Sequence, residues 1–322
     1  MPLNAFDLPG VRFAEALNAV HQGYRAARVL QVAVELDLFT VLAEGPATVE
    51  ALAARLGAEP DPLERLLTAC AALGLVVRDG DRFQNAEVAE TCLVPGRPMF
   101  QGDIVAHSLD LWAGYDRLLD RVRPRPPRKR LYGNFTRAMH QRAIAGLAQR
   151  LARNVDLAGR RQLFDVGGGA GTFSVALCQR YPGLRAVVFD RPEALAVARE
   201  VVEAYGLADR IALRAGDWNV DDFGAGNDAV LLSSVMHGPG SQAEMKLAKS
   251  FASLVPRGIL IVRGFLLDDD RSGPELPALF YLQNGAYSVG DMLELVRRAG
   301  FVEASLRLVQ SRGESVLMAL RP

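Results

Sequence analysis

The chain has few cysteines, no net charge and no long uncharged apolar run. Its 322 residues contain only Cys70, Cys92 and Cys178, whose spacing fits neither a metal site nor a disulfide framework, so we expect a reducing compartment. Basic and acidic residues number 37 each, which argues against non-specific binding to nucleic acid or anionic membranes. No apolar stretch reaches the length of about 18 residues that crosses a bilayer, and residues 1–10 lack the pattern of a signal peptide. We therefore expect a cytoplasmic protein.

The most informative stretch is a glycine-rich turn in the middle of the chain. The apolar run 163–166 predicts a buried parallel strand, and Thr172 opens an apolar helical run. Between them lie Gly167, Gly169 and Gly171, which would let the backbone approach a ligand next to the free N–H groups of the helix start. This G-x-G-x-G pattern differs from the G-x-G-x-x-G of dinucleotide enzymes and lacks the lysine of a phosphate-binding loop.

Acidic residues stand at the ends of the predicted strands. Asp165 precedes the glycines, where it would repel a pyrophosphate but suit a ligand with an ammonium or sulfonium group. Asp190 ends the next apolar strand, the position at which nucleotide-binding sheets hold ribose hydroxyls. Asp217 and Trp218 follow the strand after that one.

These segments resemble the class I S-adenosylmethionine (SAM) methyltransferases. More narrowly, the sequence is similar to the small-molecule O-methyltransferases that carry an N-terminal winged-helix dimerisation domain, a family of plant phenolic and bacterial antibiotic-tailoring enzymes. The resemblance extends over nearly the whole chain. It implies SAM as methyl donor, S-adenosylhomocysteine as product, no metal, a homodimer, and as acceptor a hydroxyl of a small aromatic or polyketide-like secondary metabolite.

The expected fold class is α/β, a Rossmann-like doubly wound sheet preceded by a winged-helix dimerisation domain. We place that first domain at 1–100, a helical linker that contributes to the substrate pocket at 101–157, and the SAM-binding catalytic domain at 158–322. In a doubly wound sheet, ligands bind at the carboxyl ends of the strands, where the acids and glycines fall. The strands are expected near 162–166, 185–190, 210–214, 228–235, 258–264, 305–310 and 314–320, and the helices near 172–181, 192–206, 241–255 and 289–299.

The N-terminal region predicts one long helix followed by a winged helix. Apolar residues from Phe13 to Leu38 recur at spacings of three and four, which fits a core face or, as the resemblance favours, a dimer interface. Helices at 49–56 and 61–73, the second with Asp61 as N-cap, precede a hairpin at 75–84. The second helix has a single basic residue, so we expect no DNA binding.

The resemblance assigns residues to the donor. The glycine turn and Asp165 would meet its carboxylate and amine, Asp190 its ribose diol, and Asp217 and Trp218 its adenine. The residues expected to bind the cofactor are Asp165, Gly167, Gly169, Gly171, Asp190, Asp217, Trp218 and Ser233.

His237 is the expected general base, because it follows a predicted strand and matches the catalytic histidine of the family. His140 and His107 are reserve candidates, and His21 fits a surface or interface position. Core packing explains the apolar residues of the helical region nearly as well as substrate binding does. The residues expected to bind substrate are Trp112, Phe135, Met139, His140, Met236, Tyr281 and Asn284.

Several departures from the family leave the acceptor open. Gly238-Pro239 replaces the usual Asp-Trp, and Arg263 stands where many relatives have a glutamate that orients the histidine. A C-, N- or S-methyltransferase, an enzyme that binds SAM without transferring methyl, and a SAM-binding regulator therefore stay as alternatives. The basic segment 121–130 could attract an acidic substrate but also fits a solvated loop, and we interpret Asp268 to Asp270 as a loop without metal.

Overall fold

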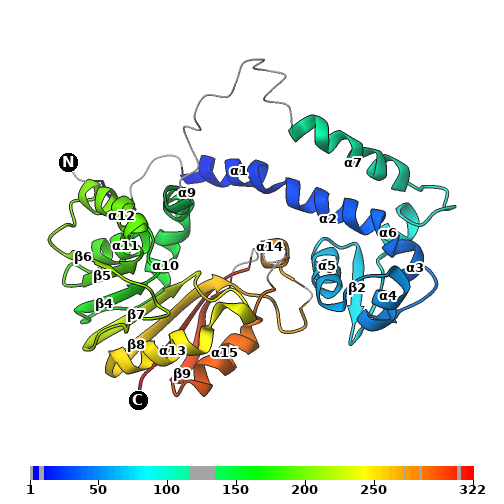
Figure 1. The fold of residues 1–322 in the computed structure, drawn as a ribbon. Helices are drawn as coiled ribbons and strands as arrows, with labels where there is room; N and C mark the ends of the chain where they lie inside the picture. The colour runs from blue at the N-terminus through cyan, green and yellow to red at the C-terminus, as the bar shows by residue number, and fades with distance from the viewer. Residues whose placement is uncertain are drawn as a thin grey trace. The chain divides into compact units, whose positions relative to one another are not determined.

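The computed structural model describes residues 3–6, 11–116, 135–271, 273–280, 282, 285–309 and 313–322. The chain forms two compact units (Figure 1). The larger unit comprises Met1–Ala19, Gly133–Leu266 and Tyr287–Pro322, and the smaller unit comprises Val20–Tyr132 and Leu267–Ala286. Each unit is thus built from segments that are distant in the sequence. The domain boundaries expected after residues 100 and 157 stay a prediction.

The smaller unit contains the predicted winged helix. Strands β1, β3 and β2 form an antiparallel sheet in that order, and β2 and β3 are the expected hairpin. Its buried core includes Phe39, Leu52, Leu67 and Phe83. The elements are α2 (Tyr24–Glu35), α3 (Leu38–Leu42), β1 (Ala47–Thr48), α4 (Val49–Leu56), α5 (Pro60–Ala72), β2 (Val76–Asp79), β3 (Arg82–Asn85), α6 (Glu87–Cys92), α7 (Gly102–Asp116) and α14 (Glu275–Phe280).

Two predicted helix boundaries are wrong. The single long helix is divided into α1 (Val11–Gln22) and α2, with a break at Gly23, because glycine weakens a helix interior. α2 ends before Asp37, whose left-handed φ of 60° cannot continue a helix. α5 begins at Pro60, so that Asp61 lies in its first turn and Glu59, with extended backbone, takes the N-cap position.

The larger unit is a seven-stranded sheet in the order β6-β5-β4-β7-β8-β10-β9. Along this order, β6, β5, β4, β7 and β8 are parallel to one another. β10 runs antiparallel to both β8 and β9. The strands are β4 (Gln162–Val166), β5 (Arg185–Asp190), β6 (Ile211–Ala215), β7 (Asn227–Ser233), β8 (Leu254–Phe265), β9 (Val302–Val309) and β10 (Glu314–Leu320). The predicted doubly wound α/β fold is therefore confirmed.

Helices cover both faces of this sheet (Figure 1). Leu163 and Leu231 belong to one buried core, which α10, α11 and α12 complete, whereas Phe164 and Val230 belong to a second core with α13 and α15. Alternate residues of a strand point to opposite faces, so these apolar strands supply both cores. The helices are α11 (Thr172–Arg180), α12 (Pro192–Ala204), η2 (Pro239–Ser241), α13 (Ala243–Ser253) and α15 (Val289–Arg298).

The last part of the helical linker expected at 101–157 is interrupted. It consists of α9 (Phe135–Arg142), the π-helical η1 (Ala143–Leu147) and α10 (Ala148–Asn154). Gly146 has a φ of 125°, a conformation that a regular helix excludes. The short helix α14 was not predicted from the sequence. Among the described residues, no helix is both long and apolar enough to span a membrane.

Candidate active site

The glycine turn between β4 and α11 requires its glycines. Gly167, Gly169 and Gly171 have φ values of 64°, 57° and 71°, which side chains of L-residues rarely adopt. A Cβ atom on Gly167 would also lie 2.8 Å from carbon atoms of both Trp218 and Val235. The backbone therefore passes closely under its neighbours before it enters α11. This closely packed turn lies at the carboxyl end of β4.

Asp190 lies half-buried at the end of β5 and is held by the turn. Its Oδ2 accepts a hydrogen bond from the Gly169 N–H (2.8 Å), and its Oδ1 accepts one from the Arg191 N–H (2.7 Å). A carboxylate has about four acceptor sites, so both oxygens keep capacity for another donor. The two backbone bonds fix the carboxylate beside the glycine turn, as a pair of ligand hydroxyls would need.

Asp165 lies in β4 beneath the glycine turn, and its expected contact with the amine of the donor stays a prediction. It is fully buried, and its carboxyl group would lie 2.8 Å from a Cβ atom on Gly168. The Ser174 hydroxyl donates to Oδ2 (2.7 Å), while Oδ1 has no hydrogen-bond partner among the described residues. Burial raises the pKa of Asp165 to about 7; the Ser174 bond lowers it and the charge of Asp190 adds to the increase. Asp165 thus supports the turn from beneath instead of facing solvent.

The segment after β6 brings an acid and an indole to this edge of the sheet. Asp217 is exposed, and its Oδ1 accepts a hydrogen bond from the Asn219 N–H (2.8 Å). Trp218 is half-buried with its ring against Gly167. At the end of β7, the buried Ser233 hydroxyl has no partner in the described part of the chain, so it can still bind a ligand. The expected binding of the adenine ring by Asp217 and Trp218, and of the donor by Ser233, stays a prediction.

His237 lies in the segment that follows β7. The strand ends at Ser233, and Ser234 has a left-handed φ of 57°, which turns the chain. His237 is half-buried, and its pKa is lowered by burial and secondarily by the positive charge of Lys246. A lowered pKa keeps the imidazole neutral at physiological pH, the state in which it can accept a proton.

His140 lies on α9 close to the glycine turn. Its Nδ1 is 2.9 Å from the hydroxyl of Thr172, the first residue of α11. Burial, with a smaller contribution from Arg137, lowers the pKa of His140. Phe135 and Met139 on the same helix are 75% and 37% exposed, so neither is packed in the core of the single chain. The sequence did not predict the contact between His140 and Thr172.

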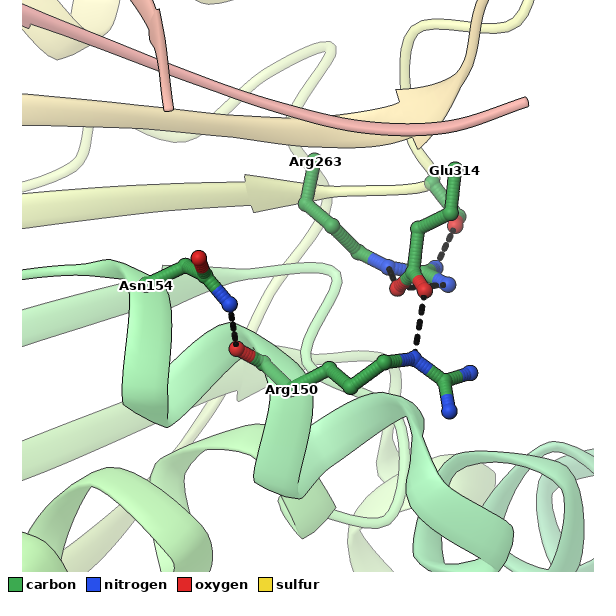
Figure 2. Close-up of polar contacts among 5 residues, drawn as sticks. Arg150, Asn154, Arg263 and Glu314 are labelled. Atoms are coloured by element: carbon green, nitrogen blue, oxygen red, sulfur yellow. Dashed lines mark hydrogen bonds and ion pairs between the residues drawn. The ribbon is translucent and has the colours of Figure 1, made fainter. Parts of the chain in front are cut away.

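The structure also explains the unexpected arginine near the end of β8 (Figure 2). Arg263 is buried, and its Nε and Nη2 both donate to Glu314 Oε1 at 3.1 Å. Its Nη1 donates to the Ser234 hydroxyl (2.6 Å), and Arg150 Nε donates to Glu314 Oε2 (3.0 Å). The buried charge of Arg263 is thus balanced by an acid from β10. The sequence alone gave no signal for this pair.

The remaining expected substrate residues belong to different units or lie outside the described residues. Met236 is buried in the core between the sheet and α13, and Trp112 lies in the smaller unit, where its indole N–H donates to Gln31. Tyr281 and Asn284 lie outside the described residues, as does the basic segment 121–130. Within the described ranges, no group of three or more acidic, histidine or cysteine side chains could hold a metal ion.

Comparison with known proteins shows the family to which the chain belongs. Residues 19–95 match the O-methyltransferase dimerisation domain, and residues 127–301 match the O-methyltransferase domain. The chain is 33% identical to the 3-hydroxy-5-methyl-1-naphthoate 3-O-methyltransferase of Streptomyces sahachiroi, with 92% of each chain covered. It is 29% identical to the N,N-dimethyltransferase OxyT of Streptomyces rimosus, with 98% of each covered. The crystal structure of an O-methyltransferase family 2 protein from Planctomyces limnophilus in complex with apigenin covers 100% of both chains, with 26% identity and a TM-score of 0.81.

Proposed function

Because the chain belongs to the SAM-dependent O-methyltransferases with an N-terminal dimerisation domain, we propose that it methylates a hydroxyl group of a small aromatic or polyketide-like compound. The observation that carries the proposal is the glycine turn with Asp190 fixed beside it. A fixed carboxylate next to a turn that a Cβ atom would fill is suited to the ribose of a nucleoside ligand.

The residues of the site fit SAM. Asp190 would hold the ribose diol with the remaining acceptor capacity of its two oxygens, and the glycine turn would hold the amino-acid end of the ligand. The Trp218 ring would stack on the adenine, and the unsatisfied Ser233 hydroxyl would bind a polar atom of the donor. Asp165, buried beneath the turn, would act by supporting it.

Bound SAM supplies an electrophilic methyl group on a positively charged sulfur. For the acceptor, His237 would remove the hydroxyl proton, which leaves the oxygen able to accept this methyl group. The lowered pKa of His237 supports this role, because burial and Lys246 both favour the neutral imidazole. The rest of the site contributes by alignment, since an in-line displacement depends on the positions of the reacting atoms.

A second acceptor class is amine nitrogen. OxyT, an N,N-dimethyltransferase by name, matches over 98% of the chain, and Gly238-Pro239 replaces the Asp-Trp pair expected after the histidine. An amine that is already neutral needs no base before methylation. Loss of activity in a His237 variant therefore separates the hydroxyl acceptor from the amine acceptor.

The exposed apolar stripe of α1 supports a homodimer. Phe13, Leu17 and Val20 are 65%, 68% and 80% exposed, an unusual arrangement for a surface in water. The match to the O-methyltransferase dimerisation domain begins at residue 19, so it includes Val20 and the end of α1. Replacing Leu17 by Lys should shift the protein from dimer to monomer in light scattering after size exclusion. A dimer that is unchanged at micromolar concentration would contradict this interface.

The function is tested by transfer of radiolabelled methyl from SAM to a panel of naphthoates, flavones and amines. With a hydroxyl acceptor, His237→Ala should reduce kcat by about 100-fold or more. His140→Ala is the matched comparison, since the His140 ring lies 2.9 Å from the hydroxyl of Thr172 at the start of α11. A large loss in His140→Ala with an unaffected His237→Ala would reassign the base, and wild-type protein that transfers methyl to no member of the panel would argue against the acceptor class.

A further inference from the structure

Lys246 of α13 is a buried lysine with three partners in the candidate site. Its side chain is almost completely inaccessible, with 3% exposure of the residue. Its Nζ donates hydrogen bonds to the carbonyl oxygens of Val235 (2.8 Å) and Ser241 (2.5 Å). The same Nζ lies 4.4 Å from the centre of the Trp218 ring. Burying an ammonium group is costly, so these contacts must compensate its lost hydration.

Val235 and Ser241, whose carbonyl groups accept these bonds, flank His237 in the sequence. We call the segment 235–241 the base loop, since it carries His237 together with Gly238, Pro239 and Gly240. Gly238 and Gly240 stand on both sides of Pro239, so the backbone directly after His237 has no side chains at these two positions to restrict it. One ammonium bound to both ends restrains the loop and therefore the imidazole between those ends.

The third partner belongs to the donor side of the site. The Trp218 ring borders Gly167 of the glycine turn, and the Lys246 ammonium approaches this ring closely enough for a cation–π interaction. Lys249, one turn later on α13, holds the backbone next to the indole by donating to the carbonyls of Trp218 (2.5 Å) and Asp221 (2.8 Å). Lys246 therefore contacts both the base loop and the indole, whereas Lys249 binds the backbone of Trp218 and Asp221.

We propose that Lys246 is a positioning residue that connects the base loop to the indole of the donor site. It thereby fixes the position of His237 relative to the methyl donor. The inference rests on the proposed function, because it assigns His237 to the acceptor side and Trp218 to the donor side. The positive charge also favours the neutral imidazole of His237, in agreement with the lowered pKa of that residue. Lys246 acts through these two residues and needs no contact with substrate.

The test uses the full-length protein with its histidines labelled at ¹³Cε1, and S-adenosylhomocysteine as the probe. The chain has four histidines, so His237→Gln identifies the signal of His237. Lys246→Met should move or broaden this signal and weaken S-adenosylhomocysteine binding in calorimetry by about 10-fold, because small misplacements in a site have large effects. Ser253→Ala is the matched control: Ser253 is buried on the same helix, and its hydroxyl donates to the Ser250 carbonyl of that helix (3.0 Å).

The outcomes separate this inference from the function on which it rests. A folded Lys246→Met protein with an unchanged His237 signal, or with unchanged affinity for S-adenosylhomocysteine, would overturn the connection. If Lys246→Met does not fold by circular dichroism, Lys246→Gln, which keeps a neutral donor of shorter reach, is held to the same two criteria. Wild-type protein that binds no S-adenosylhomocysteine would refute the donor site, while the His237 signal of the unliganded variant would still test the contact with Lys246.

Discussion

Replacing Asp165 by Asn should stabilise the protein relative to wild type. The difference in unfolding free energy between variant and wild type should increase as the pH rises from 5 to 8. Asp165 is fully buried at the end of β4, and burial raises its pKa from 3.8 to about 7. At neutral and higher pH, the folded protein must carry a buried carboxylate that the unfolded chain exposes to water. Asn has a similar shape, can accept the Ser174 hydroxyl bond and never ionises.

The magnitude follows from linkage between proton binding and folding. Between pH 4 and pH 7, the folded protein binds one more proton at Asp165 than the unfolded chain does, so the free energy of unfolding decreases by about 1.4 kcal/mol per pH unit. Stability from the protonated carboxyl is fully present below the unfolded pKa and is lost as the pH rises through the folded pKa. Over the whole window the loss is about 4 kcal/mol, and the Asn variant should not show it.

The assay is urea unfolding of both proteins at pH 5, 6, 7 and 8, followed by circular dichroism. The difference in unfolding free energy between the Asn variant and wild type should increase with pH and level off above pH 7. Asp209→Asn removes one acid from an exposed position and controls for the change in net charge. A difference that stays constant from pH 5 to 8 would refute the burial of an ionisable group beneath the glycine turn.

Three further predictions concern the same unit. Gly167→Ala should weaken S-adenosylhomocysteine binding in calorimetry. An alanine in the left-handed conformation costs about 1–3 kcal/mol, and its Cβ would lie 2.8 Å from the Val235 side chain. Unchanged affinity would contradict the need for glycine at this position. With a hydroxyl acceptor, kcat/KM should decrease only below about pH 6.5, because burial and Lys246 lower the pKa of His237 and so delay its protonation. A pH profile of kcat/KM with its midpoint above pH 7 would exclude this base. Arg263→Met should reduce stability in thermal unfolding by about 3–5 kcal/mol, since it leaves Glu314 buried without its main partner, and the added Glu314→Gln change should restore part of the loss.

The sequence was most informative where one element determines its own structure. The apolar runs that became β4 and β5 were predicted to the residue, because strands buried on both faces need continuous apolar sequence. The glycine turn was predicted because only glycine tolerates its backbone. The helix break at Gly23 was missed, since the apolar spacing continues through a glycine that many helices accommodate.

Contacts between distant segments could not be predicted in the same way. Arg263 and Glu314 are separated by 51 positions and meet because β8 and β10 are neighbours in the sheet. Lys246 donates to backbone carbonyls, which leave no mark in the sequence. The burial of Asp165 depends on how closely the turn passes over it, although its place at the strand end was correctly identified.

Binding of SAM and S-adenosylhomocysteine, measured by calorimetric titration of wild-type protein and Asp190→Ala, tests the central claim most directly. Asp190 is fixed by the Gly169 and Arg191 N–H groups and offers its remaining acceptor sites to a ribose. We expect binding of both ligands by the wild type and its loss in a variant that keeps the wild-type circular dichroism spectrum. Folded wild-type protein that binds neither ligand, or an Asp190→Ala variant that binds both as well as wild type does, would contradict the donor site described above.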